Sequence, residues 1–421
     1  MDFMILVYVL IIVAFAKAFG EAVSRVSQPP IVGELLAGVA LGPFLLGKVF
    51  PGLQDMWNVG SPRGAFVSQL ADLGMLFLML YVGLEFSPKL IRASTFLGTS
   101  IAAVGIAVPA VLGLIVGLLF DLSGLTLAFT SVAMAVTALP VTIRILKDMD
   151  VIGTRTSGTI VSAAIVTDIT LLLALGVIIG AGEESSTWSS ALYIAFGFIV
   201  FFVFALLIGR YVIPYVYGLL KWMRTGEAAF AVAVGIAIAF AIAAEWVGLP
   251  GVIGAFIAGL LLRETGTGLK VWAHVEEILS GVTLGFLAPV FFVLIGFSVK
   301  FDLVLDHLTL FAAVLLVAIF GKLAGSYLAG RVGGLGSNEA MAIGSMMMGK
   351  GAIELVFAQL ALELRLIEDY LFSVLVLMAF VSTVLAPVLF KLFFNRGIMA
   401  GEIPPLRSQS KIVLEEAEQA V

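Results

Sequence analysis

A single carboxylate, Asp168, lies near the middle of an otherwise apolar stretch that spans residues 157–182. A helix of that length can cross a bilayer, which takes roughly 20 apolar residues. A carboxylate at such depth costs at least ~2.5–3.5 kcal/mol, so these residues face the protein interior and commonly bind ions or protons. The alternative is a packing role, with the carboxylate bonded to the hydroxyl of Thr167 or Thr170. We favour ion or proton binding.

Two basic residues lie equally deep in apolar segments. Lys322 is close to the centre of residues 307–330, and Lys350 is flanked by two glycines and followed by Glu354. A buried Lys and a buried Asp on neighbouring helices offset each other's desolvation, so we expect Lys322 to be the charge partner of Asp168. In the alternative interpretation, Lys322 extends its stem to place the charge at the membrane surface.

The composition identifies the class of protein. Hydrophobic residues make up 61% of the chain, against ~45–50% in soluble domains. We therefore expect an all-α polytopic membrane protein, with residues 1–394 as one integral unit and 395–421 as a polar tail. The chain has no cysteine, and neither a nucleophile constellation, a metal-ligand spacing nor a phosphate-binding loop occurs in it. We expect no enzymatic activity, no cofactor and no nucleic-acid partner.

About thirteen membrane segments are predicted, at residues 3–20, 30–48, 66–84, 95–118, 124–147, 156–180, 188–212, 227–246, 250–263, 277–299, 307–330, 338–362 and 369–394.

The basic residues predict the orientation. With this set of segments, sixteen of the 23 Lys and Arg residues fall on the side of the C-terminus and four on the side of the N-terminus. Loops rich in Lys and Arg stay in the cytoplasm. We therefore expect a cytoplasmic (inner) membrane protein with its N-terminus outside and its C-terminus in the cytoplasm.

Two of the segments are poorly suited to be continuous helices. Residues 124–147 contain Pro140, and residues 338–362 contain Gly349 and Gly351. Pro removes a helix hydrogen bond and Gly weakens the helix, and a broken backbone at membrane depth is tolerated where it lines a cavity. The two segments are seven apart in the series, so they run in opposite directions. This spacing predicts two inverted six-helix repeats, joined by the segment at 188–212, with an ion site at the breaks.

The ordered motifs of the chain resemble those of the monovalent cation–proton antiporters, in the branch of the Kef- and NapA-type exchangers. The motifs are QPPIVGELLAGVALGP at 28–43, LYVGLEFS at 80–87, TALPVTIRIL at 137–146, VTDI at 166–169, APVFFVLIGFSV at 288–299 and GKGAIELV at 349–356. They occur in the order found in that family and cover nearly the whole chain.

The resemblance implies a fold similar to that of NhaA, with two crossed, partly unwound helices and elevator-type alternating access. It also implies a homodimer embedded in lipid. The dimerisation part would comprise about 1–94 and 227–300, the ion-transporting core about 95–180 and 307–394, and the linker helix 188–212.

By position, the resemblance assigns roles to individual residues. Those implied to bind the cation and the proton are Asp168, Thr167, Thr137 and Ala138, with Asp168 as the ligand of the monovalent cation. Lys322 matches the basic residue before the second unwound helix. Charged residues beside the unwound stretches, with a structural pairing role, are Arg144, Lys350 and Glu354.

The resemblance implies exchange of H⁺ for a monovalent cation, with Na⁺ favoured over K⁺ and Li⁺. Electrogenic members of the family carry Asp-Asp where this chain has Thr167 and Asp168, so we expect electroneutral exchange. The soluble regulatory domain of Kef-type members is not found in the sequence, so a separate regulatory subunit is expected if there is one. The alternatives are a K⁺/H⁺ antiporter, a channel-like subunit governed by a soluble partner, and a sodium-coupled organic-anion symporter.

Overall fold

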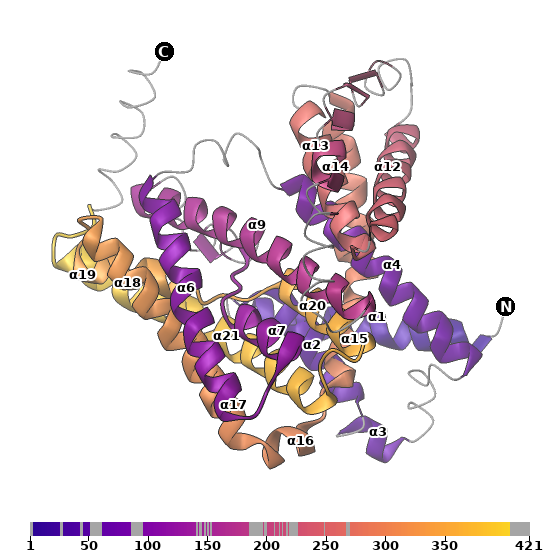
Figure 1. Ribbon diagram of the computed structural model, residues 1–421. Helices are drawn as coiled ribbons and strands as arrows, with labels where there is room; N and C mark the ends of the chain where they lie inside the picture. Colours follow the sequence, from indigo (N-terminus) through magenta and orange to yellow (C-terminus); the bar gives the residue numbers. More distant parts are fainter. Residues whose placement is uncertain are drawn as a thin grey trace.

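The computed structural model, drawn in Figure 1, is helical in all the regular structure that it describes. It describes residues 3–25, 28–42, 45–50, 61–85, 96–139, 142, 145–146, 149, 151, 154–184, 197, 200–205, 207–209, 211–212, 214–215, 218, 226–247, 249–266 and 270–404.

The described helices follow one another along the chain. Their bounds are α1 Phe3–Ser24, α2 Pro30–Leu41, α3 Leu46–Val49, α4 Pro62–Glu85, α6 Phe96–Leu119, α7 Gly124–Met134, α9 Arg155–Glu184, α12 Gly226–Trp246, α13 Gly251–Gly266, α14 Lys270–Val282, α15 Ala288–Ser298, α16 Phe301–Asp306, α17 Leu308–Leu316, α18 Lys322–Val332, α19 Ser337–Met346, α20 Ala352–Glu363 and α21 Asp369–Met399, with π-helical turns η2 Thr283–Leu287 and η3 Val317–Gly321. Helix α21 continues past residue 394, where the sequence predicted its end.

Eight helical spans in the described residues are long and apolar enough to cross a membrane, and α2, α7 and α13 are shorter apolar helices. The prediction of an all-α, multi-pass membrane protein is therefore confirmed. The count of thirteen segments stays a prediction, because most of the segment predicted at 188–212 lies outside the described residues. The tail beyond residue 404 lies outside them too.

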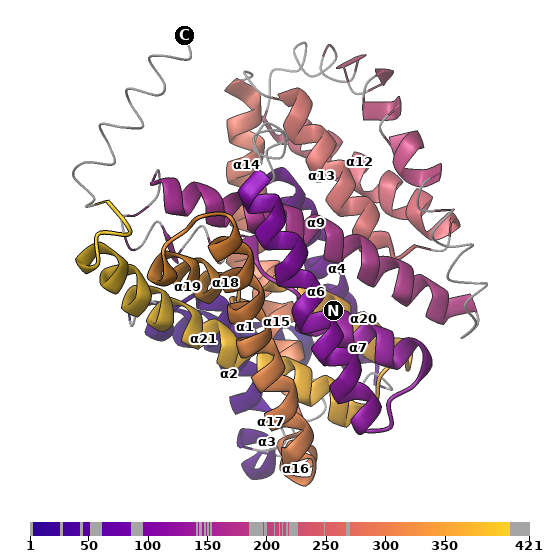
Figure 2. The same ribbon diagram turned by 60° about the vertical axis from the view of Figure 1, so that its left-hand side comes forward.

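The helices form two groups, each packed mainly within itself. The first group contains α1, α2, α4, α12, α13 and α15, and the second contains α6, α7, α9, α17, α18, α19, α20 and α21. Figures 1 and 2 show α12 and α13 on the opposite side of the molecule from α18 and α19. Small residues permit close helix crossings without a hydrophobic driving force between helices in lipid. At the crossing of α2 and α15, a Cβ on Gly38 would lie 2.8 Å from the Cα of Gly296.

A π-helical turn precedes Lys322 and sets where its side chain emerges. η3 adds one residue to the turn directly before α18, and such bulges occur frequently at functional sites. The same turn lies tightly against α6, because a Cβ on Gly321 would lie 2.9 Å from the Cβ of Pro109. Lys322 is thus held at a close helix contact in the second group, and its side chain is fully buried.

Candidate functional site

Two helix interruptions meet in the second group. α7 ends at Met134, and residues 136–138 are not helical; α19 ends at Met346, and residues 349–351 are not helical before α20 begins. The backbone N–H of Ala138 donates to the carbonyl of Gly349 at 2.9 Å, so the two breaks are in direct contact. Broken backbone exposes polar groups that require partners, and here each break supplies partners to the other.

Asp168 reaches the first break from α9. Its side chain is only 2% exposed, and Oδ2 accepts a hydrogen bond of 2.9 Å from the backbone N–H of Leu139. The other oxygen, Oδ1, is buried and has no hydrogen-bond partner. A buried carboxylate oxygen without a partner carries a high desolvation cost, which a bound proton or cation removes.

Thr137 connects the two breaks through its hydroxyl. Oγ1 donates to the carbonyl of Met347 at 2.9 Å and accepts from Lys322 Nζ, also at 2.9 Å. The Met347 carbonyl follows the end of α19, where helix carbonyls lack partners and the helix dipole is negative. Lys322 thus compensates that end through a hydroxyl. No ion pair within 4.0 Å joins the described side chains of Lys322 and Asp168. Their expected role as charge partners stays a prediction.

Lys350 compensates the corresponding end of α7 without an intermediary. Its Nζ donates to the carbonyls of Ala133 and Met134 at 2.9 and 3.1 Å, and it lies 3.5 Å from Oε2 of Glu354. Glu354 is in the first turn of α20, where the helix dipole favours a negative charge. Both charged side chains are at least 98% buried, so the pair neutralises itself inside the protein.

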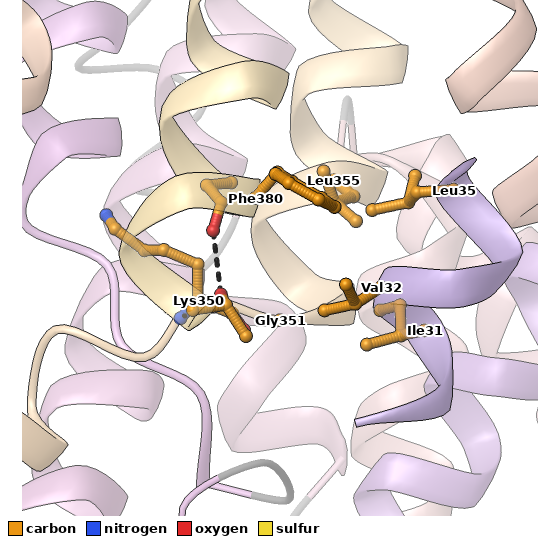
Figure 3. A pocket seen from close by; sticks show the side chains of 9 residues that line it. Ile31, Val32, Leu35, Lys350, Gly351, Leu355 and Phe380 are labelled. Atoms are coloured by element: carbon orange, nitrogen blue, oxygen red, sulfur yellow. Dashed lines mark hydrogen bonds between the residues drawn. The ribbon is translucent and has the colours of Figure 1, made fainter. Parts of the chain in front are cut away.

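The break in the second segment is also anchored to α21. The N–H of Lys350 donates to Thr383 Oγ1 at 3.0 Å. Figure 3 shows the ammonium of Lys350 directed away from α2, whose Ile31 and Val32 line the other side of a small cavity. The ammonium is therefore turned into the second group and away from the first group.

Three further residues were singled out from the sequence, and the structure describes the surroundings of two of them. Thr167 is fully buried next to Asp168, and its hydroxyl has no hydrogen-bond partner. The carbonyl of Ala138 accepts from the N–H of Thr142 at 3.0 Å, so it is already engaged. Arg144 lies outside the described residues.

Sequence reasoning did not single out two contributors to this region. One is the Leu139 N–H, which holds Asp168; no side-chain pattern identifies it, although Pro140 follows directly. The other is Thr383, which with Ser382 forms a polar pair inside the long apolar run of α21. That polar pair is a signal that could have been noticed.

The arrangement can bind one small cation or one proton at a time. Asp168 provides one free anionic oxygen beside the unpartnered hydroxyl of Thr167. Lys322 and Lys350 are the neighbouring positive charges, and both are already directed at oxygen acceptors. A single monovalent charge therefore suffices to neutralise the free carboxylate.

Comparisons with known sequences match almost the entire chain. The model of the family described as "Sodium/hydrogen exchanger, transmembrane" matches residues 9–396. The "Na(+)/H(+) antiporter" of Enterococcus hirae is 28% identical over 390 residues, covering 92% of this chain and 98% of that protein. The "Na(+)/H(+) antiporter NhaS4" of Synechocystis is 31% identical over 407 residues, covering 93% and 97%. The "Na(+)/H(+)-K(+) antiporter GerN" of Bacillus cereus is 27% identical over 398 residues, covering 94% and 97%.

A solved structure has the same fold. The sodium proton antiporter MjNhaP1 from Methanocaldococcus jannaschii superposes with a TM-score of 0.68, covering 95% of this chain and 98% of that one. The two sequences are 16% identical.

Proposed function

Because the chain belongs to the sodium/hydrogen exchanger family, we propose that it is a secondary active antiporter that exchanges H⁺ for a monovalent cation at Asp168. The observation that carries the proposal is the free oxygen of Asp168, buried beside two interrupted helices in contact. A proton and a cation neutralise the same oxygen, so binding one displaces the other. Such competition is sufficient for exchange when the site opens alternately to the two sides.

The division into two helix groups supports alternating access by sliding of one group against the other. In this proposal the second group is the moving core, at about 95–180 and 307–394. The first group is the static dimerisation part, at about 1–94 and 227–300, and a linker at 188–212 joins them. Between α2, α15 and α21 lies a cavity of about 180 Å³ with an apolar lining that includes Leu35, Val299 and Leu377. An apolar boundary has few hydrogen bonds to break when it slides.

Na⁺ is the cation that we favour, because the relatives in Enterococcus hirae and Synechocystis are named Na⁺/H⁺ antiporters. K⁺ is the second candidate, because GerN of Bacillus cereus is named an Na⁺/H⁺-K⁺ antiporter. Both ions prefer oxygen ligands, and selection between them depends on cavity size and ligand number.

The remaining proposals concern topology and assembly. We place the N-terminus outside and the C-terminus in the cytoplasm, with two inverted six-helix repeats in each chain of a homodimer in the cytoplasmic membrane. The natural chain has no cysteine, so single cysteines report orientation cleanly. A cysteine at Ser186 should react with an impermeant maleimide from outside, and one at Ser408 only after permeabilisation. The opposite labelling pattern would reverse the proposed orientation.

The exchange itself is tested in proteoliposomes that enclose a pH-sensitive dye under an imposed pH gradient. Addition of Na⁺, K⁺ or Li⁺ in separate samples should collapse the gradient for the transported ions only. The Asp168→Asn variant should be inert under the same conditions. The matched control is Glu368→Gln, which alters an exposed carboxylate at the beginning of α21. Gradient collapse by Asp168→Asn at the wild-type rate would refute the proposal.

A further inference from the structure

The boundary between the two helix groups contains two neighbouring cavities. The larger cavity is the one of about 180 Å³ between α2, α15 and α21. The smaller cavity, drawn in Figure 3, measures about 10 Å³, lies between α2, α20 and α21, and reaches Lys350 and Gly351 of the second break. Two described residues line both cavities, Leu35 of α2 and Phe380 of α21. This shared pair therefore separates the larger cavity from the second break.

The two cavities follow one another along both helices. In α2, Val39 lines the larger cavity and Ile31 the smaller one. In α21, Val376 lines the larger cavity and Thr383 the smaller one. The shared pair lies between these positions on each helix. When the shared pair moves apart, the two cavities therefore become one path to the second break.

The cavities differ in access and in polarity. Leu36 and Leu377 of the larger cavity are partly exposed, whereas Ala379 and Thr383 of the smaller one are buried. The described residues around the larger cavity are all apolar or glycine. The smaller cavity instead borders the hydrogen bond from the N–H of Lys350 to Thr383. Its volume of about 10 Å³ holds about one water molecule at most.

An apolar constriction of this kind stops ions, because water withdraws from it and a cation would have to give up its hydration. An apolar cavity of about 150 Å³ stays dry in another protein, so the larger cavity is expected to be dry too. We propose that Leu35 and Phe380 form a hydrophobic barrier that closes a route for cations between the larger cavity and the second break. Figure 3 shows Leu35 and Leu355 of α20 directed toward each other, which adds a third apolar side chain beside the barrier.

The barrier joins side chains of different helix groups, and its role in exchange rests on the proposed function. Leu35 belongs to the static group and Phe380 to the moving one, so sliding of the groups changes the distance between the two side chains. The barrier is closed in the arrangement seen here and opens when the groups slide. In the proposed orientation α21 begins outside, so the larger cavity faces the outer side of the membrane.

Access is tested without transport, by the reaction of single cysteines with Ag⁺, a small monovalent cation that binds thiols. The natural chain has no cysteine, so each variant carries one thiol. Leu377→Cys places it at the larger cavity, and Ala379→Cys places it at the smaller one. Ag⁺ in chloride-free buffer is applied in turn to intact cells and to inverted membrane vesicles. The thiols that remain are counted on the purified, denatured chain with a fluorescent maleimide.

From one side of the membrane, Leu377→Cys should react at least tenfold faster than Ala379→Cys. Addition of Phe380→Ala, or separately of Leu35→Ala, should speed the reaction of Ala379→Cys from that side at least tenfold. The matched control is Phe393→Ala, which removes a partly exposed ring of the same helix that lines neither cavity, and it should leave the rate unchanged. Only variants that stay monodisperse in detergent are compared, and the two truncations serve as independent tests.

Equal rates for Leu377→Cys and Ala379→Cys with the barrier intact would overturn the proposal. So would an Ala379→Cys rate that a folded truncation of the barrier leaves unchanged. The expected pattern from the cytoplasmic side would keep the barrier and reverse the proposed orientation. The expected pattern in a chain that exchanges no cation for H⁺ would refute the proposed function and keep the barrier.

Discussion

The two helix interruptions solve the same electrostatic problem in different ways. At the second break, Lys350 and Glu354 come from the broken segment itself and neutralise each other. At the first break, the charges arrive from other helices: Asp168 from α9 and Lys322 from the start of α18. Because Lys322 acts through Thr137, it leaves one oxygen of Asp168 free. We therefore expect the first break to exchange its neutralising ion and the second break, where Lys350 is already paired with Glu354, to keep its own.

The comparison predicts that neutralising Asp168 and neutralising Glu354 have their most different effects on the rate of transport. Asp168→Asn should abolish cation-driven proton flux, because it removes the carboxylate whose free oxygen has neither a hydrogen-bond partner nor an ion pair, whereas Glu354 is paired with Lys350. Glu354→Gln should retain flux within about a few-fold of the wild type, because Lys350 keeps its carbonyl acceptors. Initial rates in proteoliposomes, normalised to reconstituted protein, provide the measurement. Equal loss in the two variants would mean that both breaks take part in ion binding.

For the free energy of unfolding, we expect the charged residues of the second break to matter more than Asp168 does. Lys350→Met leaves Glu354 buried without its cation and deprives the Ala133 and Met134 carbonyls of a donor. Breaking a buried pair from one side costs about 3–5 kcal/mol. The melting temperature in detergent should fall clearly, whereas Lys391→Met, at an exposed position of α21, should leave it unchanged.

Addition of Glu354→Gln to Lys350→Met should recover part of the lost stability, because the orphaned buried charge is then removed. A double variant that melts below Lys350→Met would show that Glu354 is stabilised by something other than Lys350.

A smaller effect is expected for Thr137, the hydroxyl between the breaks. Thr137→Val keeps the shape but leaves Lys322 Nζ and the Met347 carbonyl without their shared partner, at a cost of about 1–3 kcal/mol. Combination with Lys322→Met should be less than additive, because both changes remove the same contact. Thr170→Val is the control, since that hydroxyl bonds to a carbonyl of its own helix. If the losses of stability from Thr137→Val and Lys322→Met were additive, the hydrogen bond between the two side chains would contribute nothing to stability.

The sequence predicted the parts of this comparison that depend on residue type. Asp168 and Lys322 stand out because charges are expensive in apolar segments. The interruptions at residues 136–138 and 349–351 could be predicted, because Pro140 follows the first and Gly349 and Gly351 lie in the second, and Pro and Gly destabilise a helix. The helical membrane class followed from the same apolar runs.

The sequence could not identify the acceptors that these charges select. Every residue has a backbone carbonyl, so the amino-acid sequence does not distinguish those of Ala133 and Met134 as the acceptors of Lys350. Those acceptors are more than 200 residues away and are defined only by the crossing of two breaks. For the same reason, we expected Lys322 to pair with Asp168, whereas its hydrogen bond is to Thr137. The assignment of Asp168, Thr167 and Lys322 to transport stays a prediction until the variants are measured.

The smallest predicted effect is that of membrane voltage, and it follows from counting charges at the first break. Asp168 holds either H⁺ or a monovalent cation, and Lys322 keeps its hydrogen bond to Thr137 in both cases. The loaded carrier then has the same charge in both directions. A voltage of 100 mV, worth ~2.3 kcal/mol per unit charge moved, should therefore not change the end-point of exchange. The measurement is Na⁺-driven proton flux in liposomes whose potential is clamped with K⁺ and valinomycin.

If Lys322 released its proton whenever Na⁺ bound, two protons would move for each Na⁺. The end-point would then follow the clamped potential, and Lys322→Gln would abolish that dependence while Na⁺ binding to Asp168 remained. Such a result would make Lys322, the cation at the first break, a second proton carrier. The two breaks would then differ further, because Lys350 and Glu354 at the second break neutralise each other.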